Sequence, residues 1–160
     1  IGLVGSEMCI RDSNSGYNTG IDILYSGTVG AAMEALANGI RSFAFSNKND
    51  TSWETADAYL ISIVKELLDE NLSMDRIWNV NFPGCELSEC KGILRDRIPA
   101  KHQFYQDDYV RTNHADGSFS LRSKGVMTEK AEEGTDISAL LNNFISIGSV
   151  RCAALGYQKD

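Results

Sequence analysis

The sequence predicts an α/β fold in which helices pack on a mainly parallel β-sheet. Two observations support this: a helical stretch is followed by a short apolar strand, and the same order of helix and strand then repeats. Apolar residues make up 42% of the 160 residues and charged residues 23%, which is typical of a globular protein. The length suits one domain, or a large part of one, with a buried core.

The first helix is expected from about Ser26 to Gly39. Alanine, the strongest helix former, dominates this stretch, with Ser26 as the N-terminal cap and Gly39 as the stop. Residues 40–46 read as a buried strand. A second helix is expected over about residues 53–72, because apolar residues recur there at helical spacing, and residues 77–82 form the next strand.

After the second strand, the pattern changes to extended segments outside the α/β core. A turn signal at residues 115–117 separates two strand-like runs and predicts a β-hairpin, so a hairpin region is expected over about residues 91–124. A short helix capped by Thr135 or Asp136 follows. The final strand covers about residues 144–150.

The first thirteen residues resemble the translation of a sequencing-library adapter. The match runs through LVGSEMCIRDS at residues 3–13, and such segments are excluded from fold reasoning. We therefore expect residues 1–13 to be non-native, with a short strand or tail as the alternative. Residues 14–160 are then expected to form an α/β domain that is incomplete at its N-terminus. Such a domain would expose apolar faces and strand edges, so we expect it to aggregate.

Charge and cysteine content narrow the classes of partner. A net charge of −7 argues against a nucleic-acid surface, but a small phosphorylated substrate is compatible with it, because a bound divalent cation can supply positive charge. The four cysteines lack the spacing of a zinc site and suit a reducing compartment. No apolar run reaches the length of a membrane span. We therefore expect a cytoplasmic protein without nucleic-acid or membrane partners.

The most informative segment is a glycine-rich loop that leads into the first helix, NSGYNTGIDILYSGT at residues 14–28. A helix N-terminus binds anions through its free N–H groups and its positive dipole end. Gly27 lets an anion approach the backbone, and Ser26 and Thr28 add hydroxyl donors. On its own, Ser-Gly-Thr before a helix is more often only a cap.

Asn14, Asn18 and Asp22 recur at every fourth residue and offer oxygen ligands to a hard cation such as Mg²⁺. Asn and Asp also favour turns, and on the residues alone that simpler explanation is preferred. His102 and His114 are expected at the surface and in the hairpin rather than as catalytic bases. The sequence contains no HExxH motif and no lysine of the P-loop type at the helix start.

The segment from Asn14 to Glu34 resembles the signature of the SurE family, in which an Asn is followed by xGxNxGxDxxYSGTVxAAxE. Three further stretches also match, and in this sequence they read NVNFP (Asn79–Pro83), KGI (Lys91–Ile93) and EGTD (Glu133–Asp136). The resemblance covers roughly residues 14–150. It implies a Rossmann-like core of three layers with a β-hairpin that is used in oligomers.

The resemblance also implies hydrolysis of nucleoside 5′- and 3′-monophosphates with Mg²⁺ or Mn²⁺, in a homo-oligomer such as a dimer or tetramer. The family holds the metal with an Asp-Asp pair, a Ser and the Asn that opens the signature, and of these only the Asn has a counterpart here, Asn14. Asn18, Ser26, Gly27 and Thr28 would line the phosphate site. No acidic pair is found, so no catalytic residue is assigned and the chain alone is expected to be inactive. The alternative is a non-catalytic module for nucleotide binding or oligomerisation.

Overall fold

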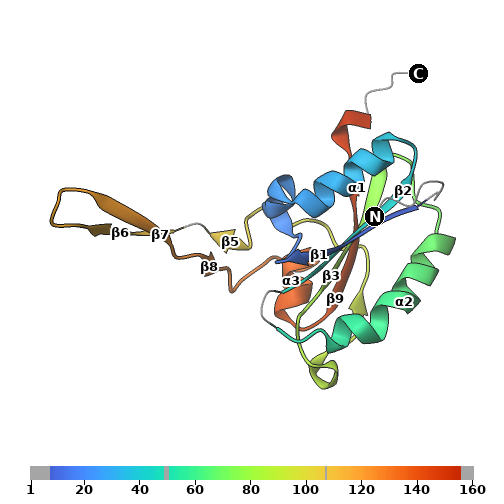
Figure 1. The fold of residues 1–160 in the computed structure, drawn as a ribbon. Coiled ribbons are helices and arrows are strands. Elements are labelled where there is room, and N and C mark those ends of the chain that lie inside the picture. The colour runs from blue at the N-terminus through green and yellow to red at the C-terminus, as the bar shows by residue number, and fades with distance from the viewer. Residues whose placement is uncertain (1–7, 49–50, 107, 156–160) are drawn as a thin grey trace.

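The computed structural model describes residues 8–48, 51–106 and 108–155 (Figure 1). Its centre is a five-stranded sheet with the strand order β1-β2-β3-β9-β4. The strands are β1 (Met8–Ser15), β2 (Arg41–Asn47), β3 (Arg76–Phe82), β9 (Ile145–Arg151) and β4 (Ile93–Leu94). The first three run parallel to one another, as predicted for β2 and β3, but β9 runs antiparallel to β3. The short helix over residues 136–141 brings the chain to the end of β3, so β9 starts beside Asn81 and runs back along β3.

Two helices cover opposite faces of this sheet, which gives the three layers expected of the fold (Figure 1). Successive residues of a strand point to opposite faces, so the two faces bury different side chains. The face under α1 (Gly27–Ala37) is lined by small and medium residues, whereas the face under α2 (Glu54–Asp69) is rich in phenylalanine. The α1 layer buries Val29, Ala32, Leu36, Ala44, Ile77 and Val150. The α2 layer buries Phe43, Phe45, Ala56, Ile63, Leu67, Val80, Phe82, Ile145 and Ile147.

Helix boundaries follow the capping residues that the sequence predicts. The Ser26 hydroxyl oxygen accepts from the Val29 N–H at 3.1 Å, and α1 ends two residues before Gly39, whose φ is 78°. The Thr135 hydroxyl accepts in the same way from the Ser138 N–H at the start of α3 (Asp136–Leu141). α2 is shorter than the sequence predicts. The loop before α1 forms a 3₁₀ helix, η1 (Gly20–Tyr25).

The predicted hairpin forms and extends away from the sheet (Figure 1). Its strands are β6 (Tyr109–Asn113) and β7 (Phe119–Ser123), and it is joined to the body by β5 (Tyr105–Gln106) and β8 (Val126–Met127). The turn is closed by a 2.9 Å hydrogen bond from the His114 N–H to the Ser118 carbonyl. Most side chains of this hairpin are exposed on both of its faces.

Strand β1 includes part of the segment that the sequence predicts to be non-native. Its pairing with β2 is irregular between Arg11 and Asn14, where two residues of β1 stand against one of β2. Residues 1–7 lie outside the described residues. An adapter origin for residues 1–13 is a statement about the DNA that encodes them, and the backbone conformation does not test it. The adapter origin therefore stays a prediction.

Within the described ranges, no helix combines the length and the apolar character that crossing a bilayer requires.

A close backbone approach at Gly148 leads to a stability prediction. A Cβ on Gly148 would lie 2.0 Å from the Arg97 carbonyl oxygen, and this contact is held by a 3.0 Å hydrogen bond from the Arg97 N–H to the Ile147 carbonyl. Gly148→Ala is therefore expected to lower the free energy of unfolding by about 1–3 kcal/mol. Gly30→Ala, on α1 with open space around it, is expected to raise it by about 0.5–1 kcal/mol. Urea unfolding measures the free energy of unfolding of both variants. If the two substitutions changed it in the same direction, that would contradict the close approach of Gly148 to the Arg97 carbonyl.

Candidate functional site

Polar residues replace apolar ones where the parallel strands end. In backbone register, Asn14 of β1 lies opposite Ser46 of β2, and Ser46 lies opposite Asn81 of β3. Asn81 in turn faces Ser146 on β9. Ser46, Asn81 and Ser146 are all buried. Ligands of open α/β sheets bind outside the carboxyl ends of the strands, so this edge is the place where a site is expected.

The loop before η1 is fixed to this edge through the backbone of Asn18. The Asn79 side-chain amide donates to the Asn18 carbonyl at 2.8 Å, and the Asn18 N–H donates to the Asn81 side-chain oxygen at 2.8 Å. The Ser46 hydroxyl also donates to that Asn81 oxygen. Asn18 itself is completely buried. The sequence analysis placed Asn18 in the phosphate site, and the structure places it directly beneath the start of α1.

Ser26 connects this buried group to the helix. Its hydroxyl donates to the Asn18 side-chain oxygen at 2.6 Å and accepts from the Val29 N–H. A hydroxyl has one proton, so in this arrangement the Ser26 proton is directed to Asn18. Gly27 is exposed with open space around its Cα, and Thr28 is half-buried. The first-turn N–H groups of Gly27 and Thr28 have no acceptor within the helix, so they are the groups placed to meet an anion.

Asp136 ties the loop to the far side of the fold. The carboxylate is 3% exposed. Burial raises its pKa above the ordinary value, and the hydrogen bonds that it accepts oppose part of that rise. It accepts from three backbone N–H groups, those of Gly20 (2.9 Å), Ala100 (2.9 Å) and Ile137 (2.7 Å). Asp136 is thus more than the helix-capping acid that the sequence suggests.

The acidic side chains near the loop do not gather around a common point in the part of the chain whose side chains are described. The Asp22 carboxylate accepts from the Phe104 and Tyr105 N–H groups, at 2.9 and 3.0 Å, so it holds a loop. No group of three or more His, Cys, Asp or Glu residues suited to a metal occurs within the described residues. Of Asn14, which the resemblance assigns to the metal, only the backbone is described, in β1 opposite Ser46. The expected metal ligation therefore stays a prediction.

Of the two histidines expected at the surface and in the hairpin, His114 is exposed but His102 is half-buried. The His114 Nε2 lies 3.2 Å from the Ser120 hydroxyl in the hairpin. The His102 carbonyl accepts from the Ile21 N–H at 3.2 Å. His102 thus contributes its backbone to the support of η1.

Sequence reasoning from the residues alone missed the supporting residues of β3. Asn79 and Asn81 alternate with apolar residues in a strand that is otherwise buried, and this two-residue period was the available signal. Tyr17 was also missed. Its hydroxyl donates to the Pro83 carbonyl at 2.7 Å, and burial raises the pKa of that hydroxyl.

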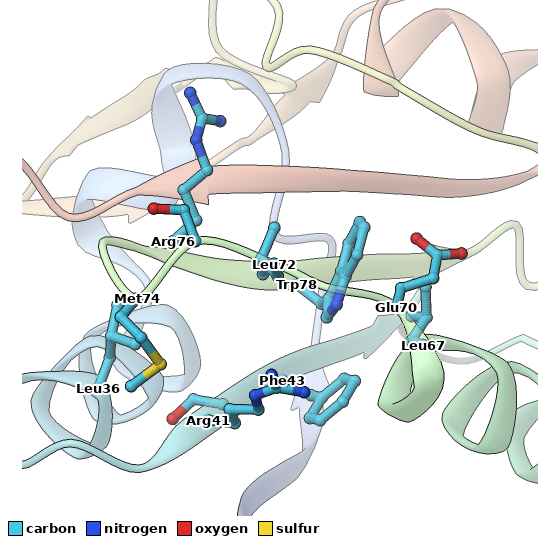
Figure 2. Close-up of a pocket in the computed structure, with 11 residues that line it drawn as sticks. Leu36, Arg41, Phe43, Leu67, Glu70, Leu72, Met74, Arg76 and Trp78 are labelled. Atoms are coloured by element: carbon cyan, nitrogen blue, oxygen red, sulfur yellow. The ribbon is translucent and has the colours of Figure 1, made fainter.

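Of the hollows near the sheet, the one in Figure 2 does not adjoin the polar edge, whereas one beside Ser46 and Phe82 and another beside Asn79 and Ser146 do. The pocket in Figure 2 opens between the first residues of β2 and β3, among Arg41, Phe43, Arg76 and Trp78, at the opposite edge of the sheet. None of the predicted site residues lines it. The hollow beside Ser46 and Phe82 lies on the α2 side of the polar edge, and its lining also includes Asn47, Trp53 and Asp57.

Comparisons with known proteins point to one family. A family model described as "Survival protein SurE" matches residues 3–104. A protein of Rhodopseudomonas palustris (strain BisA53) named 5'-nucleotidase SurE is 32% identical over 155 residues, which is 92% of this chain and 61% of that protein. The crystal structure of the SurE protein from Aquifex aeolicus matches with a TM-score of 0.77 and 32% identity, over 95% of this chain and 62% of that one. The chain thus spans about three fifths of the length of these relatives.

The buried Asp136 carboxylate leads to a prediction about stability and pH. Because its pKa is raised in the folded state, the unfolded chain loses the proton first, and the stabilisation from this group falls as pH rises above about 4. Asp136→Asn leaves one of the three N–H groups facing another donor and is expected to cost about 1–3 kcal/mol. The asparagine side chain does not titrate, so the free energy of unfolding of the variant does not follow this pH dependence. The difference in the free energy of unfolding between the variant and the unaltered chain should therefore become smaller as pH rises. Urea unfolding between pH 4 and 7 measures both effects.

Asp69→Asn, at the exposed end of α2, is the matched control and should change the free energy of unfolding by less than about 0.5 kcal/mol. If the loss of unfolding free energy in Asp136→Asn became larger as pH rises, that would contradict a raised pKa for the Asp136 carboxyl.

Proposed function

The chain belongs to the SurE family, whose model matches 3–104 of its 160 residues, and from this we propose that the protein is a phosphatase of nucleoside 5′- and 3′-monophosphates. The proposal includes dependence on Mg²⁺ or Mn²⁺, a homo-oligomeric state and a cytoplasmic location. It also includes a phosphate site made by Asn18, Ser26, Gly27 and Thr28, with Asn14 as a ligand of the metal.

The open first turn of α1 is the observation that carries the proposal. Its Gly27 and Thr28 N–H groups lie at the positive end of the helix dipole and have no helical acceptor. Ser26 holds the turn in place through Asn18, and Gly27 leaves room for a phosphate oxygen beside the backbone. The hollow beside Trp53 and Phe82, at the same edge of the sheet, supports a nucleoside as the remainder of the substrate, because an aromatic base packs well on aromatic side chains.

Hydrolysis needs more than this anion site. In the family the cation offsets the repulsion between a phosphate ester and carboxylates, and no group of three or more His, Cys, Asp or Glu side chains suited to a metal occurs among the described residues. We therefore propose that the 160-residue chain binds nucleotides without hydrolysing them at an enzymatic rate. The same observation favours the alternative of a non-catalytic nucleotide-binding module.

The test combines AMP binding with phosphate release. Gly27→Asp places a carboxylate in the first turn, where it suits the helix dipole but repels phosphate, and is expected to weaken AMP binding about tenfold. Ala37→Asp adds the same charge at the other end of α1, about 15 Å away and beyond the Debye length of about 8 Å, and should leave binding unchanged. Calorimetric titration with AMP measures binding, and a phosphate assay with Mn²⁺ measures hydrolysis.

Equal binding by both variants would place the nucleotide elsewhere and overturn the proposed site. Phosphate release by the 160-residue chain at an enzymatic rate would contradict its proposed inactivity.

The hairpin is the proposed contact with a second copy of the chain. One face of it carries Tyr109, Phe119 and Leu121, which are 57%, 52% and 58% exposed. Exposed apolar patches of this kind commonly mark protein–protein contacts. The Arg111 guanidinium lies 4.0 Å from the centre of the Phe119 ring and belongs to the same face.

Replacing Phe119 and Leu121 together by Ser is expected to shift the oligomer to a smaller species, because the apolar area buried on association is lost. Ile61→Ser, at a position of α2 that is 62% exposed, is the control. Size-exclusion chromatography with light scattering gives the mass of each. An unchanged oligomer in the double variant would rule out this contact.

A further inference from the structure

Two side-chain amides of β3 hold the backbone of Asn18 much as a neighbouring strand would. Asn79 and Asn81 are two residues apart, so they point to the same face of the sheet, the α1 face to which Ile77 also belongs. Asn79 binds the carbonyl of Asn18, and Asn81 binds its N–H, each at 2.8 Å. A single strand therefore supplies a partner for each backbone polar group of one loop residue, and the Ser46 hydroxyl oxygen of β2 also accepts from the Asn18 N–H at 3.2 Å.

The two amides have opposite roles and are not interchangeable. Asn79 must present its NH₂ group, because its partner is a carbonyl oxygen. Asn81 must present its oxygen, because its partners are an N–H and the Ser46 hydroxyl. Within the described residues, the remaining atom of each amide, the Asn79 oxygen and the Asn81 nitrogen, makes no hydrogen bond. Each of the two asparagines therefore holds the Asn18 backbone through a single side-chain atom.

The hydrogen bonds continue from Asn18 to the open turn of α1. The Asn18 side-chain oxygen accepts from the Ser26 hydroxyl at 2.6 Å, and the Ser26 oxygen accepts from the Val29 N–H at 3.1 Å. Asn79 and Asn81 are 4% and 0% exposed. Amides buried in this way cost free energy unless their hydrogen bonds are made, so the arrangement tolerates little displacement.

We propose that Asn79 and Asn81 are positioning residues, which set the first turn of α1 through Asn18 and Ser26 and so hold its N–H groups in place for phosphate. The phosphate part of this inference rests on the proposed function. The positioning part rests only on the hydrogen bonds and burial described above.

A matched pair of substitutions tests the positioning. Asn79→Asp and Asn81→Asp add the same charge in nearly the same shape, but only Asn79→Asp removes a group that makes a hydrogen bond. Within residues 26–30, the Val29 and Gly30 N–H groups donate to Ser26, and we expect their amide hydrogen exchange to become about tenfold faster or more in Asn79→Asp. In Asn81→Asp it should stay within about threefold of the unaltered chain. Mass spectrometry of peptides from the exchanged chain measures this at low protein concentration.

Exchange in α2 separates local from global effects. It should not change in either variant, because α2 lies on the other face of the sheet. Thr55→Val is the control for a buried hydrogen bond, since the Thr55 hydroxyl donates to the Cys85 carbonyl at 2.9 Å away from α1, and it should leave residues 26–30 unaffected. Equal acceleration in the two Asp variants, or equal acceleration in α1 and α2, would overturn the positioning role.

Ser26→Ala provides a second test if an Asp variant fails to fold. It breaks the same chain of bonds at its half-buried end, so it should accelerate exchange at residues 26–30 and leave β3 protected. No acceleration there would also overturn the proposal.

Repeating the exchange in inorganic phosphate distinguishes the two parts of the inference. Phosphate is expected to slow exchange of residues 26–30 most in the unaltered chain. It should slow exchange more in Asn81→Asp than in Asn79→Asp, because both variants carry the same added charge but only Asn79→Asp has lost a hydrogen bond. If phosphate slows exchange in none of them, the proposed phosphate site fails, whereas the exchange without phosphate still decides the positioning role. Equal slowing in Asn79→Asp and in the unaltered chain would overturn the link between positioning and phosphate.

Discussion

A loop that crosses the end of a β-sheet leaves the ladder, yet its buried N–H and carbonyl groups still need partners. The loop before α1 meets this constraint with side chains from distant segments rather than with another strand. Asn79 and Asn81 satisfy the backbone of Asn18, and Asp136 satisfies the N–H of Gly20. The position of η1, and of α1 after it, follows from these contacts.

The two faces of the sheet serve different purposes. The α2 face is filled by large aromatic and aliphatic side chains and gives the sheet most of its apolar burial. The α1 face is apolar only near the amino ends of the strands and becomes polar toward their carboxyl ends, at Ser46, Asn79 and Asn81. A helix with small residues such as Ala32 packs closely on this face, and its N-terminus lies over the polar end.

Among the residues whose side chains the structure describes, that end is neutral. The side chains directly beneath the first turn of α1 are amides and hydroxyls, and the nearby carboxylates of Asp22 and Asp136 are directed to backbone N–H groups. A neutral network under a helix N-terminus leaves the helix dipole uncompensated, which suits a phosphate group. The chain has a net charge of −7, so this local neutrality matters for an anionic ligand.

Interactions between residues close in the chain were predictable from the sequence. The helices α1 and α2 and the strands β2, β3 and β9 followed from residue pattern, although β1 did not, and the Ser26 and Thr135 caps followed from residue type. Each of these depends on neighbours within a few positions. The contact of Asn18 with Asn81 joins residues 63 apart, and that of Gly20 with Asp136 joins residues 116 apart. Such contacts depend on strand order and on the direction of β9, which no local pattern encodes. The sequence alone therefore determined the elements and the residues of an anion-binding helix start, whereas the tertiary structure decided which distant amides and carboxylates support that start.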